Sequence, residues 1–253
     1  MLKIKLFQMN LNRILTLSIM GMLFVSFSLS SAKDFKSIKD KADYYKTLYK
    51  VDCLNEKITD NFGNGFEDVY GTRNMRTILY GVAYRGGSNN FYHKTNKRDN
   101  HNPLPDDGLT HLCMQGFSNA VYLYSTNFAE SKRQYINNET NDTLNYLQNS
   151  GNDRKAMKNL LLMVKNVIDN PSEGPIYFHC WNGWHQSGYV SSAILMQFCG
   201  LTNAQAYQYW LDNTDNVNKG YENVKSMVKN FKTFDDIKIS DETKELICPC
   251  MKK

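Results

Sequence analysis

One cysteine stands where a predicted strand ends in a tight loop and the loop leads into a helix. The apolar run PIYF leads into His179 and Cys180, the loop turns at Gly183, and a helical pattern begins at Ser187 and Gly188. Such a strand, loop and helix gather backbone N–H groups around one point and add the positive end of the helix dipole, so they attract phosphate. A thiol at that place is expected to ionise readily and to act as a nucleophile.

The stretch HCWNGWHQSG resembles the signature loop of the cysteine-dependent protein tyrosine and dual-specificity phosphatases. The pattern of that family is HCxxGxxR followed by Ser or Thr. His179, Cys180, Gly183 and Ser187 match it at the right intervals, and the arginine position holds Gln186.

The surroundings of the loop resemble the same family. AYRGGSNN and DGLTHLCMQGFSNAVYLYS are similar to the opening of compact dual-specificity phosphatases, and LTNAQAYQYW is similar to the helix that follows their signature helix. The resemblance runs from about residue 79 to residue 232, or roughly 60% of the chain. It implies a phosphotyrosine-phosphatase-like fold of the dual-specificity type.

The resemblance also implies a role for the residues of the loop. Cys180 would attack phosphorus and carry a covalent phosphocysteine, while the loop amides from Trp181 to Ser187 hold the phosphoryl oxygens. His179 would orient the loop through hydrogen bonds, and Ser187 would help the thiolate leave when water resolves the intermediate. The alternative for Cys180 is a buried apolar cysteine. The candidate catalytic residues are Cys180, Asp153, Ser187 and His179, and the candidate substrate-binding residues are Trp181, Asn182, Gly183, Trp184, His185, Gln186 and Arg85.

An aspartate is expected as well, because the family protonates the leaving oxygen with one that precedes the cysteine and lies just ahead of a helix. Asp153 lies 27 residues before Cys180, at the start of a predicted helix. Asp142 is the second choice. The alternative for Asp153 is an N-cap, since aspartate is favoured at that position.

The loop lacks the arginine of the family. An arginine fork grips two phosphoryl oxygens and stays charged, whereas Gln186 offers one amide donor and no charge. Losing a single transition-state donor typically lowers a rate by about 10² to 10³-fold. The chain is therefore a weakened enzyme, a binding protein, or an enzyme that takes its cation from elsewhere, for which the candidates are His185, Arg85 and Arg154.

Two tryptophans also depart from the small or polar residues usual in this loop. The rings of Trp181 and Trp184 can form an apolar rim that selects an aromatic or sugar-bearing substrate, stack on a partner, or pack into the core. The sequence leaves these three interpretations open.

The elements predicted around the loop alternate between strands and helices. Buried strands are expected over 77–87, 117–125 and GPIYFHC, and helices over 107–115, 153–170, 187–200, 203–213 and 218–232. Residues 33–75 read as a surface segment and residues 126–152 as a long loop. The alternation predicts an α/β protein with a central, mainly parallel sheet flanked by helices.

The chain of 253 residues, 42% of them hydrophobic, suits one globular domain. Residues 1–32 combine a basic start, an apolar core and small residues at a cleavage site, which predicts a secretory signal peptide. The alternative is an uncleaved membrane anchor. Residues 33–253 would form the mature domain, and the loss of three basic residues lowers the net charge from +5 to +2, which argues against a nucleic-acid partner.

Export implies a secreted or periplasmic location, where disulfides persist. All six cysteines lie in the mature chain. Cys53 and the terminal CPC lie near its two ends, so we expect a disulfide from Cys53 to Cys248 or Cys250. Cys199 is expected to be a buried apolar residue. No CxxC pair or histidine spacing of a metal site accompanies the cysteines, so neither a metal nor another cofactor is expected.

Two functions follow from these features. The first is an exported cysteine-dependent phosphoric monoester hydrolase, acting on a phosphorylated protein or a small phosphorylated molecule, with no nucleic acid and, after signal cleavage, no membrane as partner. The second is a pseudophosphatase that binds a phosphorylated or anionic ligand without turnover. A thiol-redox or acyl-transfer role for Cys180 is disfavoured, because no resolving cysteine or base is close in sequence.

Overall fold

The computed structural model describes residues 34–92 and 99–250, and the predicted signal peptide lies outside these ranges. In this part of the chain one sheet has the strand order β1-β2-β6-β3-β5-β4. The four central strands run parallel to one another, and β1 and β4 are antiparallel to their neighbours. The predicted α/β class with a mainly parallel sheet is confirmed. The strands are β1 (Thr72–Leu79), β2 (Ala83–Ser88), β3 (Asn119–Tyr122), β4 (Gln134–Ile136), β5 (Thr143–Gln148) and β6 (Ile176–Cys180).

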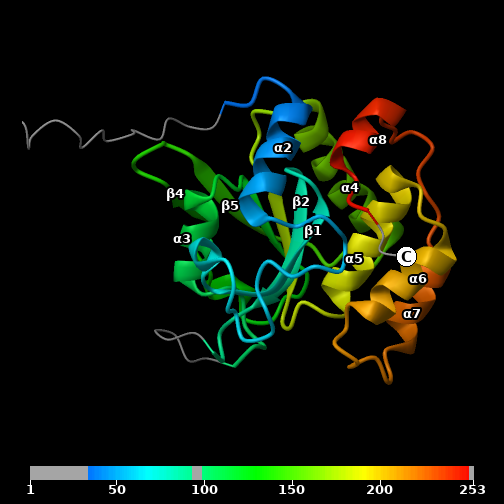
Figure 1. The fold of residues 1–253 in the computed structure, drawn as a ribbon. Helices are drawn as coiled ribbons and strands as arrows, with labels where there is room; N and C mark the ends of the chain where they lie inside the picture. The colour runs from blue at the N-terminus through cyan, green and yellow to red at the C-terminus, as the bar shows by residue number, and fades with distance from the viewer. Residues whose placement is uncertain (1–33, 93–98, 251–253) are drawn as a thin grey trace, which may run out of the picture. The chain divides into compact units, whose positions relative to one another are not determined.

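Helices cover both faces of the sheet (Figure 1). Alternate residues of β6 enter two separate cores: Ile176 and Phe178 pack with α4 to α8, and Tyr177 packs with α2 and α3. This alternation is the two-residue period of a strand buried on both faces. The helices are α2 (Ile38–Tyr49), α3 (Asp106–Met114), α4 (Arg154–Asp169), α5 (Gln186–Ile194), α6 (Asn203–Asp212), α7 (Glu222–Lys229) and α8 (Asp241–Ile247), with short turns η1 (Glu67–Val69), η2 (Phe128–Glu130) and the π-helical η3 (Leu195–Cys199).

The strand predicted over 77–87 is in fact two antiparallel strands, β1 and β2, joined by a tight turn. Gly81 in this turn has a φ of +68°, and a Cβ on it would lie 2.9 Å from the carbonyl oxygen of Lys41. A side chain is therefore excluded there. The apolar run continues through the turn, so hydrophobicity alone does not reveal the reversal.

The long loop predicted over 126–152 contains the hairpin of β4 and β5. Tyr135, Leu144 and Tyr146 are buried and alternate with exposed or half-buried residues, as expected for strands at the rim of a sheet. The asparagine-rich composition hides this pattern in the sequence. The surface segment predicted over 33–75 likewise contains helix α2, whose N-cap is Ser37.

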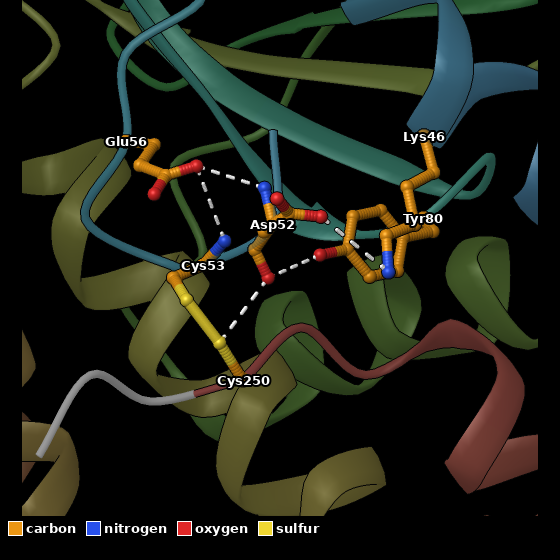
Figure 2. The surroundings of a disulfide bond; sticks show 6 residues. All are labelled: Lys46, Asp52, Cys53, Glu56, Tyr80 and Cys250. Atoms are coloured by element: carbon orange, nitrogen blue, oxygen red, sulfur yellow. Dashed lines mark hydrogen bonds and ion pairs between the residues drawn. A yellow bond between two sulfur atoms is a disulfide. The ribbon is translucent and has the colours of Figure 1, made fainter. Parts of the chain in front are cut away.

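A disulfide joins Cys53 to Cys250, as Figure 2 shows, which confirms one of the two predicted pairings. The carboxylate of Glu56 accepts from the backbone N–H groups of Asp52 (2.8 Å) and Cys53 (3.4 Å). The hydroxyl of Tyr80 donates to the carbonyl oxygen of Asp52 at 2.5 Å. The disulfide thus ties the C-terminal segment to a loop that is already held by hydrogen bonds.

A second disulfide joins Cys199 to Cys248, so the prediction that Cys199 is an apolar core cysteine is wrong. Cys199 lies at the end of η3, and Cys248 follows α8. The sequence patterns did not predict helix α8. Cys113 and Cys180 are free and buried.

The described ranges contain neither a helix that could span a membrane nor a cluster of metal-binding side chains. No helix there is both long and apolar enough to cross a bilayer. No cluster of three or more histidine, cysteine or acidic residues there has a metal-binding arrangement.

Candidate active site

Cys180 is the last residue of β6, a central strand of the sheet. His179 is level with Gly86 of β2 and Tyr122 of β3, so Cys180 lies at the carboxyl edge of the parallel strands, between two neighbours. Ligand sites of open α/β sheets lie at this edge. The side chain of Cys180 is 3% exposed.

The loop after Cys180 returns to it at the first turn of α5. The Sγ of Cys180 lies 3.4 Å from the Oγ of Ser187, which is fully buried. Residues 181–186 therefore curve around the sulfur atom. This is the arrangement that the strand, loop and helix sequence predicts.

Glycine backbones pack directly against one another beneath this loop. Gly183 has a φ of +75°, and a Cβ on it would lie 2.7 Å from the carbonyl carbon of Gly86 and from the nitrogen of Gly87. A Cβ on Gly87 would in turn lie 2.5 Å from the carbonyl carbon of Asn182. Neither position accepts a side chain, so the glycines of β2 and of the loop together allow its tight curve.

The loop carbonyl groups are held from outside the curve. The guanidinium of Arg85 donates to the carbonyl oxygens of Gly183 (2.6 Å) and Trp184 (3.0 Å). Three neighbouring carbonyl oxygens also accept hydrogen bonds. That of Trp181 accepts from the backbone N–H of Ser88 (3.0 Å) and that of Asn182 from the side-chain amide of Asn74 (2.8 Å). That of His185 accepts from the indole N–H of Trp210 (3.1 Å).

The backbone N–H groups of residues 184–188 have no acceptor within the described part of the chain. Buried N–H groups are nearly always paired, and the first turn of a helix leaves its own donors free. The loop therefore presents unpaired donors, at the positive end of α5, next to the nucleophile candidate. A tetrahedral oxyanion is a ligand of matching charge and hydrogen-bonding capacity.

His179 is fully buried, and burial lowers its pKa to about 3. The imidazole is therefore neutral. Its Nδ1 lies 3.2 Å from the carbonyl oxygen of Cys180 and must carry the proton, so its Nε2 accepts from the hydroxyl of Tyr146 at 2.9 Å. The ring stacks against the rings of Tyr122, Tyr146 and Tyr177. This environment fits a residue that orients the loop and does not serve as a base.

Gln186 does not extend into the curve of the loop. Its side-chain nitrogen donates to the carbonyl oxygen of Ser150 and to Oδ1 of Asn152, both at 2.6 Å. The donor that the sequence offered to an anion is thus already used to join the loop to the segment before α4. No charge enters the loop at this position.

Each of the three candidate substitute cations already has other contacts. Arg85 donates to the loop carbonyl oxygens of Gly183 and Trp184. Arg154 donates to the carbonyl oxygens of Lys232 and Thr233. His185 donates from Nε2 to the carbonyl oxygen of Val217 at 2.5 Å, and burial lowers its pKa, so it is neutral.

The two candidate acids lie at opposite ends of the sheet. Asp153 is the N-cap of α4, where its Oδ1 accepts from the N–H of Ala156 at 2.8 Å. It follows Asn152, which contacts Gln186, so it lies at the same edge as Cys180. Asp142 precedes β5, whose residue Asn145 is level with the start of β3 and β6. Asp142 is therefore at the amino edge, too far along the sheet to serve Cys180.

Both loop tryptophans are partly buried, and the indole N–H of each donates a hydrogen bond. Trp181 donates from Nε1 to the hydroxyl of Tyr122 (2.8 Å), and its ring centroid lies 4.4 Å from that of Tyr124. Trp184 donates from Nε1 to Oδ2 of Asp215 at 3.2 Å. Burial raises the pKa of Tyr124, and the proximity of Cys180 adds to that rise. Trp181 thus packs against the core cluster that contains Tyr122 and Tyr177, which agrees with the third interpretation, and Trp184 is held by Asp215.

Two charged residues of the site were missed in the sequence. Arg73, on β1, donates from Nη1 to Oδ1 of Asn182 at 3.2 Å. The carboxylate of Asp215 accepts a hydrogen bond from Trp184 and forms ion pairs with Lys57 (2.9 Å) and Arg76 (3.5 Å). The signal for Arg73 was a charged residue just before an apolar run. Asp215 lies in DNTDNVNKG, which reads only as a turn.

The chain is similar to several solved phosphatase structures at low sequence identity. No protein-family model matches the chain, and no curated protein matches it. The PTP-2 phosphatase of Cydia pomonella is a similar solved structure, with 18% identity over 63% of this chain and 89% of that chain and a TM-score of 0.43. The PP-IP phosphatase SIW14 of S. cerevisiae is similar at 14% identity over 70% and 93%, with a TM-score of 0.41. TpbA of P. aeruginosa is similar at 13% identity over 62% and 86%, with a TM-score of 0.38.

These names agree with the family that the loop sequence resembles. With identities below 20% and TM-scores below 0.5, the likeness carries nothing about the reaction. The chemistry of this chain must be inferred from its own residues.

Proposed function

We propose that the chain hydrolyses phosphate monoesters, with Cys180 as the nucleophile. The observation that carries this proposal is the contact of Cys180 Sγ with Ser187 Oγ at 3.4 Å, within a loop whose following N–H groups have no acceptor in the described chain. A buried free thiol next to unpaired donors fits phosphoryl transfer better than apolar packing.

The reaction would proceed in two displacements. In the first, the N–H groups of residues 184–188 hold the phosphoryl oxygens, Cys180 Sγ forms a bond to phosphorus, and the bond from phosphorus to the ester oxygen breaks. Asp153, in its protonated form, would give the leaving oxygen its proton. In the second, a water molecule attacks phosphorus and gives a proton to Asp153, which is now a carboxylate, while the bond to sulfur breaks and the hydroxyl of Ser187 donates a hydrogen bond to the departing thiolate.

The substrate would be a phosphorylated protein or a small phosphorylated molecule. The half-buried rings of Trp181, Trp184 and Tyr124 near the loop would favour a flat or apolar group next to the phosphate. An exported location, secreted or periplasmic, is proposed from the pattern of residues 1–32, and both disulfides are compatible with it.

The test uses the two free, buried cysteines as a matched pair. Purified protein with its disulfides intact is assayed with p-nitrophenyl phosphate. We expect Cys180→Ser to lower turnover by more than roughly 10³-fold and Cys113→Ser to leave it unchanged, and a quenched reaction of the wild type to contain phosphocysteine at position 180. Turnover that survives in Cys180→Ser would reject the mechanism.

A binding protein without turnover is the second candidate, and the contacts of Gln186 favour it. Its amide nitrogen is committed to Ser150 and Asn152, so the loop holds an anion with neutral backbone donors alone. Wild-type protein that binds tungstate but hydrolyses no phosphomonoester would support this function over the first. In a binding protein, Gln186→Arg should then lower the affinity for the specific ligand. In an enzyme, the same substitution should raise turnover by roughly 10²-fold.

A further inference from the structure

Three buried arginines share one face of the sheet beside the loop. Arg73, Arg76 and Arg85 are each at most 3% exposed. Arg76 pairs with Arg85 across β1 and β2, and Arg73 pairs with Gly87, two residues beyond Arg85, so all three are on the same face. A register shift between Arg73 and Arg76 makes this possible despite their odd spacing.

The positive charge of this cluster is not balanced within the described residues. Asp215 is the carboxylate that pairs with it, through Arg76, and Asp215 is shared with Lys57. Arg85 binds carbonyl oxygens and the hydroxyl of Tyr209, all neutral. Burial and the neighbouring Arg85 lower the pKa of Arg76 to about 10. Buried charge without a partner is strongly unfavourable, so a cluster that keeps this surplus is suited to an anionic ligand.

Arg73 is the member of the cluster that forms a hydrogen bond with a side chain of the loop, whereas Arg85 bonds to loop carbonyl groups. Its Nη1 donates to Oδ1 of Asn182, two residues after the nucleophile, and its Nη2 donates to the side chain of Asn61. Its guanidinium carbon lies 5.8 Å from the centre of the Trp184 ring. The Nε of Arg73 is buried and unpaired. Burial lowers the pKa of Arg73, and Cys180 is among the groups that oppose this effect, so the two are close enough to interact.

We propose that Arg73 supplies, from β1, the positive charge that position 186 of the loop lacks. It acts through Asn182 as a positioning residue that draws an oxyanion to the loop. The three cations that the sequence offered are engaged elsewhere or neutral: Arg85 binds the loop carbonyls, Arg154 binds residues 232 and 233, and His185 is neutral. This inference rests on the anion site of the proposed function, but not on turnover.

The test is the affinity for tungstate, measured by calorimetry at pH 7 with Arg73→Gln and Arg73→Lys. We expect Arg73→Gln to weaken binding by roughly 10 to 30-fold, the effect of one unit charge at moderate distance in a protein. Arg73→Lys keeps the charge and should stay within about threefold of the wild type, since only the fork is lost. The salt dependence of binding should be smaller in Arg73→Gln.

Unchanged affinity in Arg73→Gln would overturn the inference, and so would equal losses in the Gln and Lys variants, which indicate a merely structural contact. Should Arg73→Gln not fold, Asn61→Asp decides, because a carboxylate at this other partner of Arg73 would neutralise it from outside the loop. Unchanged tungstate affinity in that variant also overturns the inference. Absence of tungstate binding in the wild type would instead reject the anion site itself, and with it the proposed function.

Discussion

Gly183→Ala is expected to destabilise the loop more than the addition of a methyl group at any other position in it. The residue has a φ of +75°, where an alanine costs roughly 1 to 2 kcal/mol. Its Cβ would also lie 2.7 Å from backbone atoms of Gly86 and Gly87, which cannot rotate away as a side chain can. Overpacking of this kind typically costs about 1 to 3 kcal/mol. We therefore expect a loss of roughly 2 to 5 kcal/mol in the free energy of unfolding.

Gly220→Ala is a matched control. Gly220 has a φ of +78°, but a Cβ there would meet nothing within 4 Å. It should cost only the roughly 1 to 2 kcal/mol of the left-handed conformation, so the difference between the two variants isolates the contact of the loop with β2. Urea unfolding with the disulfides intact measures both, and tungstate binding should be lost in Gly183→Ala alone. Equal destabilisation by the two substitutions, or full tungstate affinity in Gly183→Ala, would refute this account of the loop.

Three further changes test the charges and the disulfide. Because burial lowers the pKa of His179 from 6.5 to about 3, the unfolded chain takes up a proton below pH 6.5 that the folded chain refuses, so stability falls with pH by about 1.4 kcal/mol per unit. His179 should contribute roughly 2 kcal/mol to the loss measured by urea unfolding from pH 7 to pH 5, so the loss should be smaller by that amount in His179→Gln, where only the contribution of the buried His185 remains. Asp215→Asn should lower the free energy of unfolding by roughly 1 to 3 kcal/mol, because Arg76 loses its carboxylate partner. The same substitution should raise the affinity for tungstate, because it removes a negative charge. A fall in both stability and tungstate affinity would contradict the surplus of positive charge. Cys250→Ser opens a loop of 197 residues and should cost roughly 3 to 5 kcal/mol in thermal or urea unfolding, and an unchanged stability would show that the disulfide contributes nothing.

The α/β class and the elements next to the nucleophile could be predicted because they depend on local patterns. The strand ending at Cys180, the glycine turn and the following helix are consecutive in sequence. The cap at Asp153 and the capping box of Thr202 and Gln205 are also local, and both are present. The hairpin of β4 and β5 escaped prediction, because its polar residues suit an edge strand as well as a loop.

The cysteines show the limit of local reasoning in another way. The expected disulfide from Cys53 to Cys248 or Cys250 depends on the tendency of the two ends of a domain to lie close together, and the second of these pairings is present. Cys199 lies within an apolar helix pattern, and nothing in that pattern reveals a partner 49 residues away. The pairing depends on α8, whose short sequence has no strong apolar period.

The amino-acid sequence by itself determined that a thiol, a turn of glycine and a helix start lie together, because a strand, a loop and a helix that follow one another leave little freedom in their relative placement. Only the tertiary structure decided which groups surround that thiol. Gln186 bonds to a segment 34 residues earlier, Arg85 to carbonyl oxygens 98 and 99 residues later, and Arg73 to a side chain 109 residues later. Such contacts follow from strand order and from one register shift in β1, and these are properties of the whole sheet that no short stretch of residues encodes.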